Sequence, residues 1–511
     1  MSEARATPKG WTIARLGDVG HWYGGGTPSK FEPRFWTNGT IPWVSPKDMK
    51  ALRITDSQDH LSAAAIQETN IREFPSGTVL FVIRSGILAR TFPVGVAEVS
   101  GTMNQDLKGV RPIDGVEPLF LAYQLIGRER EVLNRCSKHG TTVASIDTER
   151  LHDFEVRMAP PAEQIRIVAK IEELFSDLDA GVAALERVRV SLKRYRASVL
   201  KAAVEGRLTE EWRKRNPVQE SGAQLLERIL AERRAKWEQE QLRKFKEAGK
   251  TPPKGWREKY KQPPSADTKN LAAPPPSWCW ATIEQLSIKV VDGVHRKPNY
   301  TDSGIPFVTV RNLTAGPGIS FEKLNYVSEA DHTEFSKRTD VQRGDILISK
   351  DGTLGVTRVV RTDIPFSIFV SVALVKPVHY EYSEYLGRAM SSLPVQNQMV
   401  PKGSGLQHIH LEDLRCDAVP LPPLAEQAEI VAEVDRRLSV ADAAEQQIEH
   451  ALQRAARLRQ SILRRAFEGK LVPQNPTDEP AAAHLERTKP PSNGNLPAQA
   501  KPSMRGSGVR V

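Results

Sequence analysis

The sequence predicts an α+β fold in which two β-rich domains alternate with two long helices, so that the chain forms a pseudo-two-fold internal repeat. The first observation is a duplicated motif, because Glu163-Gln164 and Ile167-Val168 return as Glu426-Gln427 and Ile430-Val431. The second is a register kept at an offset of about 263 residues, as one gap-free element in each copy would give. The third is the glycine-punctuated, β-rich stretch that precedes each motif. We call these two stretches the first head and the second head.

The first head is predicted to span residues 1–159. Runs at 41–44 and 77–83 are apolar, rich in β-branched or aromatic residues and bounded by glycine, which is typical of buried strands. Segments 24–28 and 84–86 contain glycine together with serine, threonine or proline and are predicted loops.

The first long helix is predicted over residues 160–206. It begins at Pro160-Pro161, where the missing N–H is not needed, and ends at Gly206. Residues 207–276 have no counterpart in the second half. Within them, Leu225 to Lys246 is predicted to be a charged amphipathic helix whose Trp237 and Phe245 pack on the long helices or on a partner. The proline-rich, basic stretch that follows is predicted to be a semi-rigid connector.

The second head is predicted over residues 277–421, with the same strands and loops. Ile305 to Val308 corresponds to 41–44, and Gly344 to Ile348 corresponds to the strand that begins at Gly77. Lys350-Asp351-Gly352 is matched to Arg84-Ser85-Gly86, and 403–409 to 140–146. The two heads are therefore expected to share a fold, while most of their loop residues differ.

The second long helix is predicted over residues 422–472, from Pro422-Pro423 to just past Gly469. In both helices apolar residues alternate in steps of four and three, which predicts a coiled-coil seam. Each helix would be roughly 65–70 Å long, and because the helices enter from opposite heads we expect them to pair antiparallel. The predicted pairing residues are Ile171, Leu174, Leu178, Leu185, Val188, Leu192, Ile430, Val434, Leu438, Ile448, Leu452 and Ile462. The tail, residues 473–511, is rich in Pro, Ala, Ser and Asn and is predicted to be disordered.

Composition limits the classes of function. The chain has 511 residues and is 39% hydrophobic, which predicts three or four structural units with a sizeable core. Its formal net charge of +10 favours a polyanionic partner. Three widely spaced cysteines form no CxxC pair, so neither a disulfide framework nor a zinc site is expected. The sequence shows no secretory signal and no membrane-spanning run, and a cytoplasmic location is expected.

The ordered, duplicated set of motifs resembles the specificity subunit of type I restriction-modification systems. It consists of a proline pair followed by Ala-Glu-Gln or Leu-Ala-Glu-Gln, a long heptad helix, and EGRL or EGKL at the helix end. GGGTPS, IPWVSPKDM and GTTVASI look like a target recognition domain of that family, and IPFVTVRNL and GSGLQHI look like a second one. The resemblance covers the chain except the tail and the stretch after Arg207.

The resemblance implies a DNA reader without catalytic activity. Each head would read one half of a bipartite, asymmetric site in double-stranded DNA, and the paired helices would set the gap between the halves. The chain would bind two methyltransferase subunits and, with them, restriction subunits. It would need no cofactor itself, whereas its partners would use S-adenosylmethionine, ATP and Mg²⁺. A relative with a fused or separate methyltransferase remains an alternative.

Candidate DNA contacts are polar loop residues near the matched glycine segments, because such side chains bind phosphates and base edges. In the first head they are Lys47, Arg84, Arg90, Lys138, Thr141 and Thr142. In the second head they are Arg296, Lys297, Arg311, Asn312, Lys350, Lys402, Ser404 and Gln407. A solvated surface side chain is the alternative for each of them, and core packing is expected for Trp43 and Phe307.

Motifs for catalysis are missing from the sequence. It has no phosphate-binding GxxxxGK[ST] loop, no GxGxxG fingerprint and no Asn-Pro-Pro-aromatic or Asp-Pro-Pro-aromatic motif. His408 and His410 are the only tempting metal pair, and a structural or DNA-contacting role is expected for them. The competing hypothesis is a coiled-coil scaffold whose basic heads bind proteins, which strongly salt-dependent binding would argue against.

Overall fold

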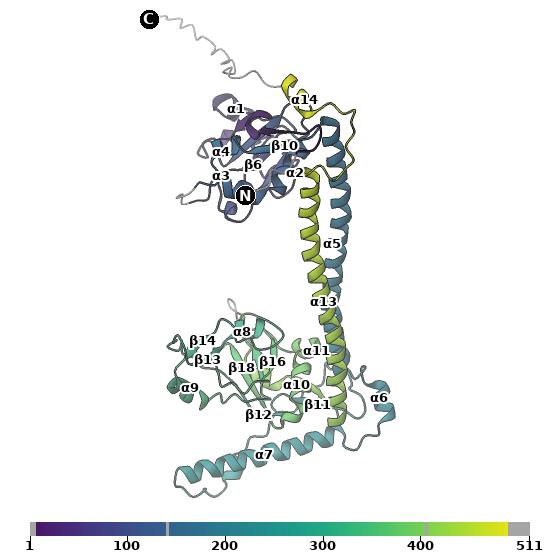
Figure 1. Cartoon of the computed structure of the whole chain (residues 1–511). Helices are drawn as coiled ribbons and strands as arrows, with labels where there is room; N and C mark the ends of the chain where they lie inside the picture. The colour runs from purple at the N-terminus through teal and green to yellow at the C-terminus, as the bar shows by residue number, and fades with distance from the viewer. Residues whose placement is uncertain (1–6, 139–142, 404–406, 489–511) are drawn as a thin grey trace, which may run out of the picture. The chain divides into compact units, whose positions relative to one another are not determined.

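The computed structural model describes residues 7–138, 143–403 and 407–488 (Figure 1). The chain divides into two compact units, one made of Met1–Leu185 with His450–Val511 and the other of Glu186–Glu449. Each unit holds one head and a part of both long helices. Within the described residues, no helix has the length and apolar character that crossing a lipid bilayer requires.

The first head is built from short strands in three sheets. Strand β1 (Thr12–Arg15) pairs antiparallel with β10 (Glu155–Met158) and so closes the domain at its two ends. The five-stranded sheet has the order β2 (Gly20–Gly24), β9 (Leu107–Pro112), β6 (Val79–Val82), β7 (Val94–Ala97), β4 (Arg53–Ile54). The three-stranded sheet has the order β5 (Asp59–Leu61), β3 (Ile41–Val44), β8 (Thr102–Met103). The predicted buried strands at 41–44 and 77–83 are thus confirmed.

The second head repeats this topology almost strand for strand. Strands β11 (Cys279–Thr282) and β19 (Ala418–Leu421) close it. The larger sheet has the order β12 (Ser287–Asp292), β18 (Val372–Pro377), β15 (Ile346–Ser349), β16 (Thr357–Val359). The smaller has the order β14 (Asn325–Val327), β13 (Ile305–Val308), β17 (Ser367–Ile368). Pairs β3–β8 and β13–β17 are both parallel, which confirms that the heads share a fold.

Short helices complete each core. Those of the first head are α1 (Ala63–Glu68), α2 (Pro118–Gly127), α3 (Glu129–Cys136) and α4 (Thr148–His152). Those of the second are α8 (Val310–Thr314), α9 (Glu329–Ser336), α10 (Ser383–Met390), α11 (Leu393–Gln396) and α12 (Leu411–Cys416). The apolar helix α2 packs on β6 and β7, and α10 packs on β16. Trp43 and Phe307 are buried, as expected for core residues.

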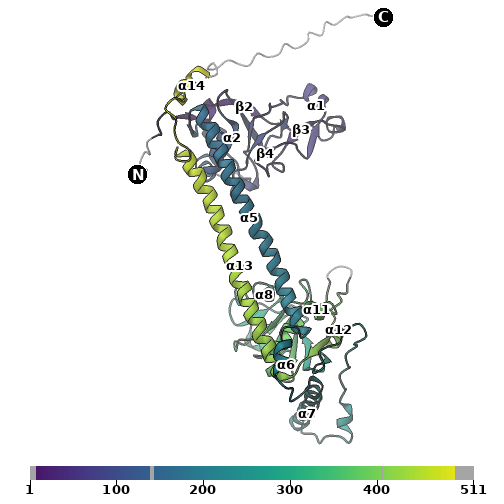
Figure 2. The same cartoon turned by 90° about the vertical axis from the view of Figure 1, so that its right-hand side faces the viewer.

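The long helices are α5 (Pro161–Val204) and α13 (Leu424–Phe467), and each begins within two residues of its predicted proline pair. Both end shortly before a glycine in the left-handed region, Gly206 at φ 71° and Gly469 at φ 68°. In the second unit Arg196 pairs with Asp442 and Glu445, at 2.5 and 2.8 Å. In the first unit Arg459 pairs with Asp179 and lies over the ring of Phe175. Residue numbers that increase along α5 are thus paired with residue numbers that decrease along α13, so the helices run antiparallel (Figure 2).

The predicted pairing residues are mostly shielded from solvent, several of them within the cores of the heads. Ile171, Ile430, Val434, Ile448 and Ile462 are buried, and Leu174, Leu178, Leu185, Leu192, Leu438 and Leu452 are half-buried. Val188 contradicts the prediction because it is 49% exposed, and Tyr195, seven residues later, is exposed too. A straight helix drifts by about 20° per heptad relative to a strict seven-residue repeat. This drift turns the position of Val188 and Tyr195 toward solvent and brings Arg196 to face α13.

The stretch from 207 to 276 contains three helical elements. It forms α6 (Glu210–Arg215), α7 (Gly222–Glu247) and a short 3-10 helix, η4 (Trp256–Lys259). Helix α7 confirms the predicted amphipathic helix and begins with a capping box of Ser221 and Gln224. Trp237 and Phe245 do not have the expected contact with the long helices, and a contact with a partner stays a prediction. Both rings pack instead against Trp256 of η4, at centroid distances of 6.0 and 6.1 Å.

The prediction of a disordered tail is wrong for residues 473–488, which lie on the first head and include α14 (Ala481–Thr488). Three contacts hold this segment. Asp478 pairs with Arg166 at 2.5 Å, the Ala481 N–H donates to Gly10 O, and His484 Nε2 lies 2.7 Å from Asp114 O. Polar residues can anchor a segment in this way even where its composition contributes little apolar surface. Residues 489–511 lie outside the described residues.

Candidate nucleic-acid interface

The turn that follows β3 or β13 has the same construction in both heads. Ser45 N–H and Oγ donate to Asp48 at 2.8 and 2.9 Å, and Thr309 N–H and Oγ1 donate to Asn312 Oδ1 at 3.0 and 3.1 Å. Asn312 is buried, and its amide also donates to Ser320 O. The Asn312 side chain therefore caps the turn, and its contact with DNA stays a prediction.

The same turn presents one exposed cation in each head. Lys47 lies one residue before Asp48, and Arg311 lies one residue before Asn312, so the two occupy equivalent positions. Both side chains are exposed, and their neighbours hold the turn by side-chain hydrogen bonds. A cation presented on a fixed turn is suited to a phosphate or to the acceptor edge of guanine.

In the first head the predicted loops meet around residues 104–106. The N–H of Asn104 donates to Val44 O at the end of β3, and Arg84 Nε donates to Asp106 at 2.6 Å. Arg84 also bridges Ser145, which brings it beside the segment that contains Lys138. Arg84 and Lys138 are both exposed. Thr141 and Thr142 lie outside the described residues, and exposed Arg90 follows a short 3-10 helix, η3 (Gly86–Ala89).

The predicted match between Lys350 and Arg84 is shifted by one residue. Ile146 N–H donates to Ile83 O and Ile409 N–H donates to Lys350 O, both at 2.8 Å, so Lys350 takes the place of Ile83. Asp351, bridged to His408, takes the place of Arg84. Because side chains alternate along an extended chain, Lys350 points inward, where its side chain is 11% exposed and lies 3.3 Å from Asp292. Lys350 is therefore engaged with Asp292, and its contact with DNA stays a prediction.

Three basic side chains surround the buried carboxylate of Asp292 in the second head. Arg338, His295 and Lys350 approach its carboxylate at 2.5, 3.1 and 3.3 Å. Burial by itself would raise the pKa of Asp292, but the hydrogen bonds from Arg338 and His295 and the charge of Lys350 outweigh it, and the pKa lies below its usual value. The carboxylate thus ties three segments together beneath the loop that follows β12.

That loop carries two predicted contacts, Arg296 and Lys297, and both are exposed. The guanidinium of Arg296 lies 3.6 Å from Asp331 and over the ring of Phe335. Lys402 pairs with Asp413 at 2.6 Å and its backbone exchanges two hydrogen bonds with His408. Gln407 is exposed, whereas Ser404 lies outside the described residues. The rings of His408 and His410 lie 4.7 Å apart, and no group of three metal-ligand-type side chains occurs among the described residues.

Two glycines allow these loops to approach the sheet. A Cβ on Gly25 would lie 1.8 Å from Asn104 O, and one on Gly293 would lie 2.1 Å from Ile368 O. Both glycines directly follow the first strand of the larger sheet. Sequence reasoning missed the carboxylates that position the cations, Asp106 and Asp292. The signal that could have found them is an acidic residue within a few positions of a loop glycine in otherwise apolar surroundings.

Fixed turns present exposed cations, and Arg84 and Arg338 pair with the carboxylates of Asp106 and Asp292. Such a surface can contact phosphates through Lys and Arg and can contact base edges through Arg and Gln.

Comparison with known proteins gives a consistent result. The family model of the type I restriction modification DNA specificity domain matches residues 8–186 and 295–454. The specificity subunit of the Escherichia coli type I restriction enzyme EcoR124I/EcoR124II is 36% identical over 170 residues, which is 33% of this chain and 42% of the relative. The E. coli EcoBI specificity subunit is 28% identical over 359 residues, 68% of this chain and 66% of the relative.

One solved structure shares the fold across nearly the whole chain. It comes from work on complex assembly and conformational transition of the type I R-M system. It aligns with 91% of this chain and 99% of its own at 20% identity, with a TM-score of 0.57. By contrast, the match to the EcoR124I/EcoR124II relative spans less than half of that relative's length.

Proposed function

This chain belongs to the family of type I restriction modification DNA specificity domain proteins, and from that premise we propose that it is the DNA-reading subunit of a type I restriction-modification complex. Each head reads one half of a bipartite, asymmetric site in double-stranded DNA. The observation that carries the proposal is one scaffold built twice with different polar loops. Equivalent positions hold Arg84 in one head and Asp351 in the other, so the two heads contact different bases.

The long helices set the distance between the half-sites and bind two methyltransferase subunits, with which restriction subunits then associate. Apolar side chains that the helices leave exposed, namely Val188, Val190, Tyr195, Val440 and Leu458, are available for contact with another protein. The alternative of a scaffold whose heads bind proteins finds no support in the matched family, which is a DNA specificity domain.

The chain itself carries out no chemistry in this proposal. S-adenosylmethionine, ATP and Mg²⁺ serve the partner subunits. The purified chain should neither methylate nor cut DNA until partners are added. Turnover by the chain alone, purified from a host that lacks the partner genes, would contradict the proposal.

The deciding experiment is genome-wide mapping of methylated bases in the host with and without this chain. We expect one bipartite motif to lose methylation when the chain is deleted and to regain it on complementation. A second complementation with Lys47→Ala and Arg311→Ala should weaken methylation of that motif. The matched control is Lys201→Ala and Lys269→Ala, two exposed lysines away from the head loops. An unchanged set of methylated sites after deletion would contradict the proposed function.

A further inference from the structure

A strongly basic surface lies at the far end of α7, outside the loops described above. We call residues 243–261 the basic tip, which comprises the end of α7, the following loop and η4. It holds eight basic side chains, Arg243, Lys244, Lys246, Lys250, Lys254, Arg257, Lys259 and Lys261, against the acidic Glu247 and Glu258. All eight basic side chains are exposed. A large part of the positive charge of the chain is therefore concentrated here.

An aromatic cluster fixes the shape of the basic tip. Trp237 of α7 stacks on Trp256 and meets the edge of Tyr260 at a centroid distance of 5.3 Å, while Phe245 packs on the other side of Trp256. Trp256 is buried, and the Tyr260 hydroxyl accepts a hydrogen bond from Arg233 at 2.8 Å. The chain after α7 is thus folded back and held, so its lysines keep a defined place.

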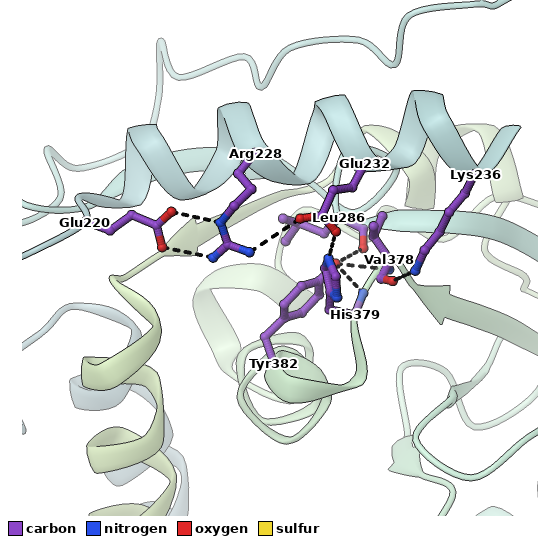
Figure 3. Close-up of polar contacts among 8 residues, drawn as sticks. All are labelled: Glu220, Arg228, Glu232, Lys236, Leu286, Val378, His379 and Tyr382. Atoms are coloured by element: carbon purple, nitrogen blue, oxygen red, sulfur yellow. Dashed lines mark hydrogen bonds and ion pairs between the residues drawn. The ribbon is translucent and has the colours of Figure 1, made fainter. Parts of the chain in front are cut away.

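Helix α7 is in turn fastened to the second head, as Figure 3 shows. Glu232 contacts His379, Lys236 donates to Val378 O, and Arg233 donates to Ser287 O at 2.8 Å. Leu225 and Ile229 are buried in the core of the second head. At the start of the helix a Cβ on Gly222 would lie 2.1 Å from Leu421 O, so the backbone lies directly on the sheet. The basic tip is therefore attached to the second head through α7.

The basic tip holds several lysines without an ion-pair partner in the part of the chain that the structure describes. Along α7, Arg228 binds Glu220 with two hydrogen bonds of 2.9 Å, Arg234 pairs with Glu238, and Arg243 pairs with Glu240 and Glu247. By contrast, five lysines of the basic tip have no carboxylate within ion-pair distance among the described residues: Lys246, Lys250, Lys254, Lys259 and Lys261. Exposed lysines without protein partners leave their full charge available to an external polyanion.

One basic side chain of the tip, Lys244, lies close enough to β12 to act on Lys289. Burial lowers the pKa of Lys289 on β12, and the charges of Lys376, Arg338 and Lys244 lower it further against the opposing charge of Asp340. Lys244 therefore acts on the same surface as Arg338, which in turn binds Asp292 beneath the 295–297 loop.

We propose that the basic tip binds the phosphate backbone of the DNA duplex that flanks the half-site of the second head, without reading bases. The inference rests on the proposed function and adds a second contact to it. Lysine is a flexible point charge and suits phosphates, whereas protein interfaces are depleted of lysine and rich in exposed aromatic anchors. Here the aromatic side chains face one another, and the free cations are all lysines. Both features favour DNA over an acidic protein.

The test compares two triple variants of the full chain, each in complex with its methyltransferase subunits. The first variant carries Lys250→Gln, Lys254→Gln and Lys259→Gln in the basic tip. The control carries Lys201→Gln, Lys214→Gln and Lys269→Gln, three exposed lysines elsewhere in the second unit. Binding to duplexes that contain the target site is measured by fluorescence anisotropy between 50 and 300 mM salt. One duplex extends about 15 base pairs beyond the second half-site, and the other ends at it.

Each phosphate contact contributes about 0.9 to the slope of log affinity against log salt, so the basic-tip variant should lose about two to three units of slope. Its affinity for the long duplex should fall about tenfold or more at 0.1 M salt, while the control keeps the affinity of the unmodified complex. On the short duplex all three complexes should bind alike. The methylated motif should remain the same.

Equal slopes for the basic-tip and control variants on the long duplex would overturn the inference and leave the proposed function intact. So would loss of methyltransferase subunits from the basic-tip variant in gel filtration, which would identify the basic tip as a protein contact. If the unmodified complex showed no preference for the target site, the proposed function itself would fail. Equal melting temperatures of the three complexes are expected, because no substituted lysine is buried.

Discussion

At the residue scale, a buried glutamate joins each head to its long helix. Trp11 Nε1 donates to Glu163 at 3.1 Å, and Trp278 Nε1 donates to Glu426 at 2.8 Å. The second copy is reinforced, because Glu426 also accepts hydrogen bonds from Thr209 at 2.7 Å and Arg213 at 2.9 Å. In the first copy burial raises the pKa of Glu163. The carboxylate of the motif therefore accepts more hydrogen bonds in the second copy than in the first.

This asymmetry predicts unequal costs for the same substitution. Glu426→Gln leaves the half-buried guanidinium of Arg213 without a carboxylate and should lower the free energy of unfolding by about 2–4 kcal/mol. Glu163→Gln keeps an acceptor for Trp11 and should cost less than about 1.5 kcal/mol. Denaturant midpoints followed by circular dichroism measure both, and each variant is the control for the other. Equal midpoints would show that Arg213 does not depend on Glu426.

A second residue-scale prediction concerns pH. Burial, together with the nearby Asp413, raises the pKa of Asp417 to about 7, and one of its buried oxygens has no hydrogen-bond partner among the described residues. Because the folded chain holds a proton that the unfolded chain has released, this residue makes stability fall as pH rises from about 4 to about 7. Asp417→Asn removes that penalty.

The Asp417→Asn variant should therefore be more stable than the unmodified chain at pH 8, by on the order of 2–4 kcal/mol, and nearly unchanged at pH 4. Urea denaturation at both pH values measures the difference. Asp302→Asn, at an exposed position, is the control and should shift neither value. An equal gain at both pH values would point to packing rather than titration.

At the scale of elements, the register of α5 and α13 allows a matched insertion. Because Arg459 pairs with Asp179 and Arg196 with Asp442, a point between Ala183 and Ala184 corresponds to one between Arg454 and Ala455. Four residues inserted at both points add about 6 Å of helix and roughly keep the facing sides. At about 3.4 Å per base pair, the gap between half-sites should lengthen by one or two pairs, with the half-site bases unchanged.

Mapping of methylated sites measures this effect. A two-residue insertion at both points is the control, because it turns the following faces by about 200° and should lower stability without giving a new functional gap. A four-residue variant that methylates the original gap would mean that the helices do not determine the spacing.

At the scale of the whole molecule, the heads should be interchangeable. Antiparallel pairing of β1 with β10 brings the two ends of the first head together, so residues 10–158 form a closed piece whose replacement leaves α5 in place. Residues 10–158 can be replaced by the head of another family member, with Trp11 kept so that it still donates its hydrogen bond to Glu163. This chimera should change one half of the methylated motif and leave the other half and the gap unchanged. A chimera that altered both halves would contradict independent heads.

Local sequence determined the repeat, the buried strands and the helix limits of this protein. Proline pairs and closing glycines act on the backbone around them, and apolar periodicity needs no distant partner to be recognised. The position of a side chain in a motif was less informative about whether that side chain is exposed or bound within the protein. Arg84 and Lys350 look alike in sequence, yet one is exposed and the other is buried on Asp292. Asn312 looks like a base reader and is a turn cap.

Only the tertiary structure decided these cases. A one-residue shift on an extended segment moves a side chain to the opposite face of the sheet. In addition, a buried carboxylate far away in sequence can bind a cation that would otherwise face solvent. The same reason explains the tail and the basic tip. Polar segments carry little apolar signal of their own, so their order depends on contacts such as His484 with Asp114 and Trp237 with Trp256, which exist only once the chain has folded.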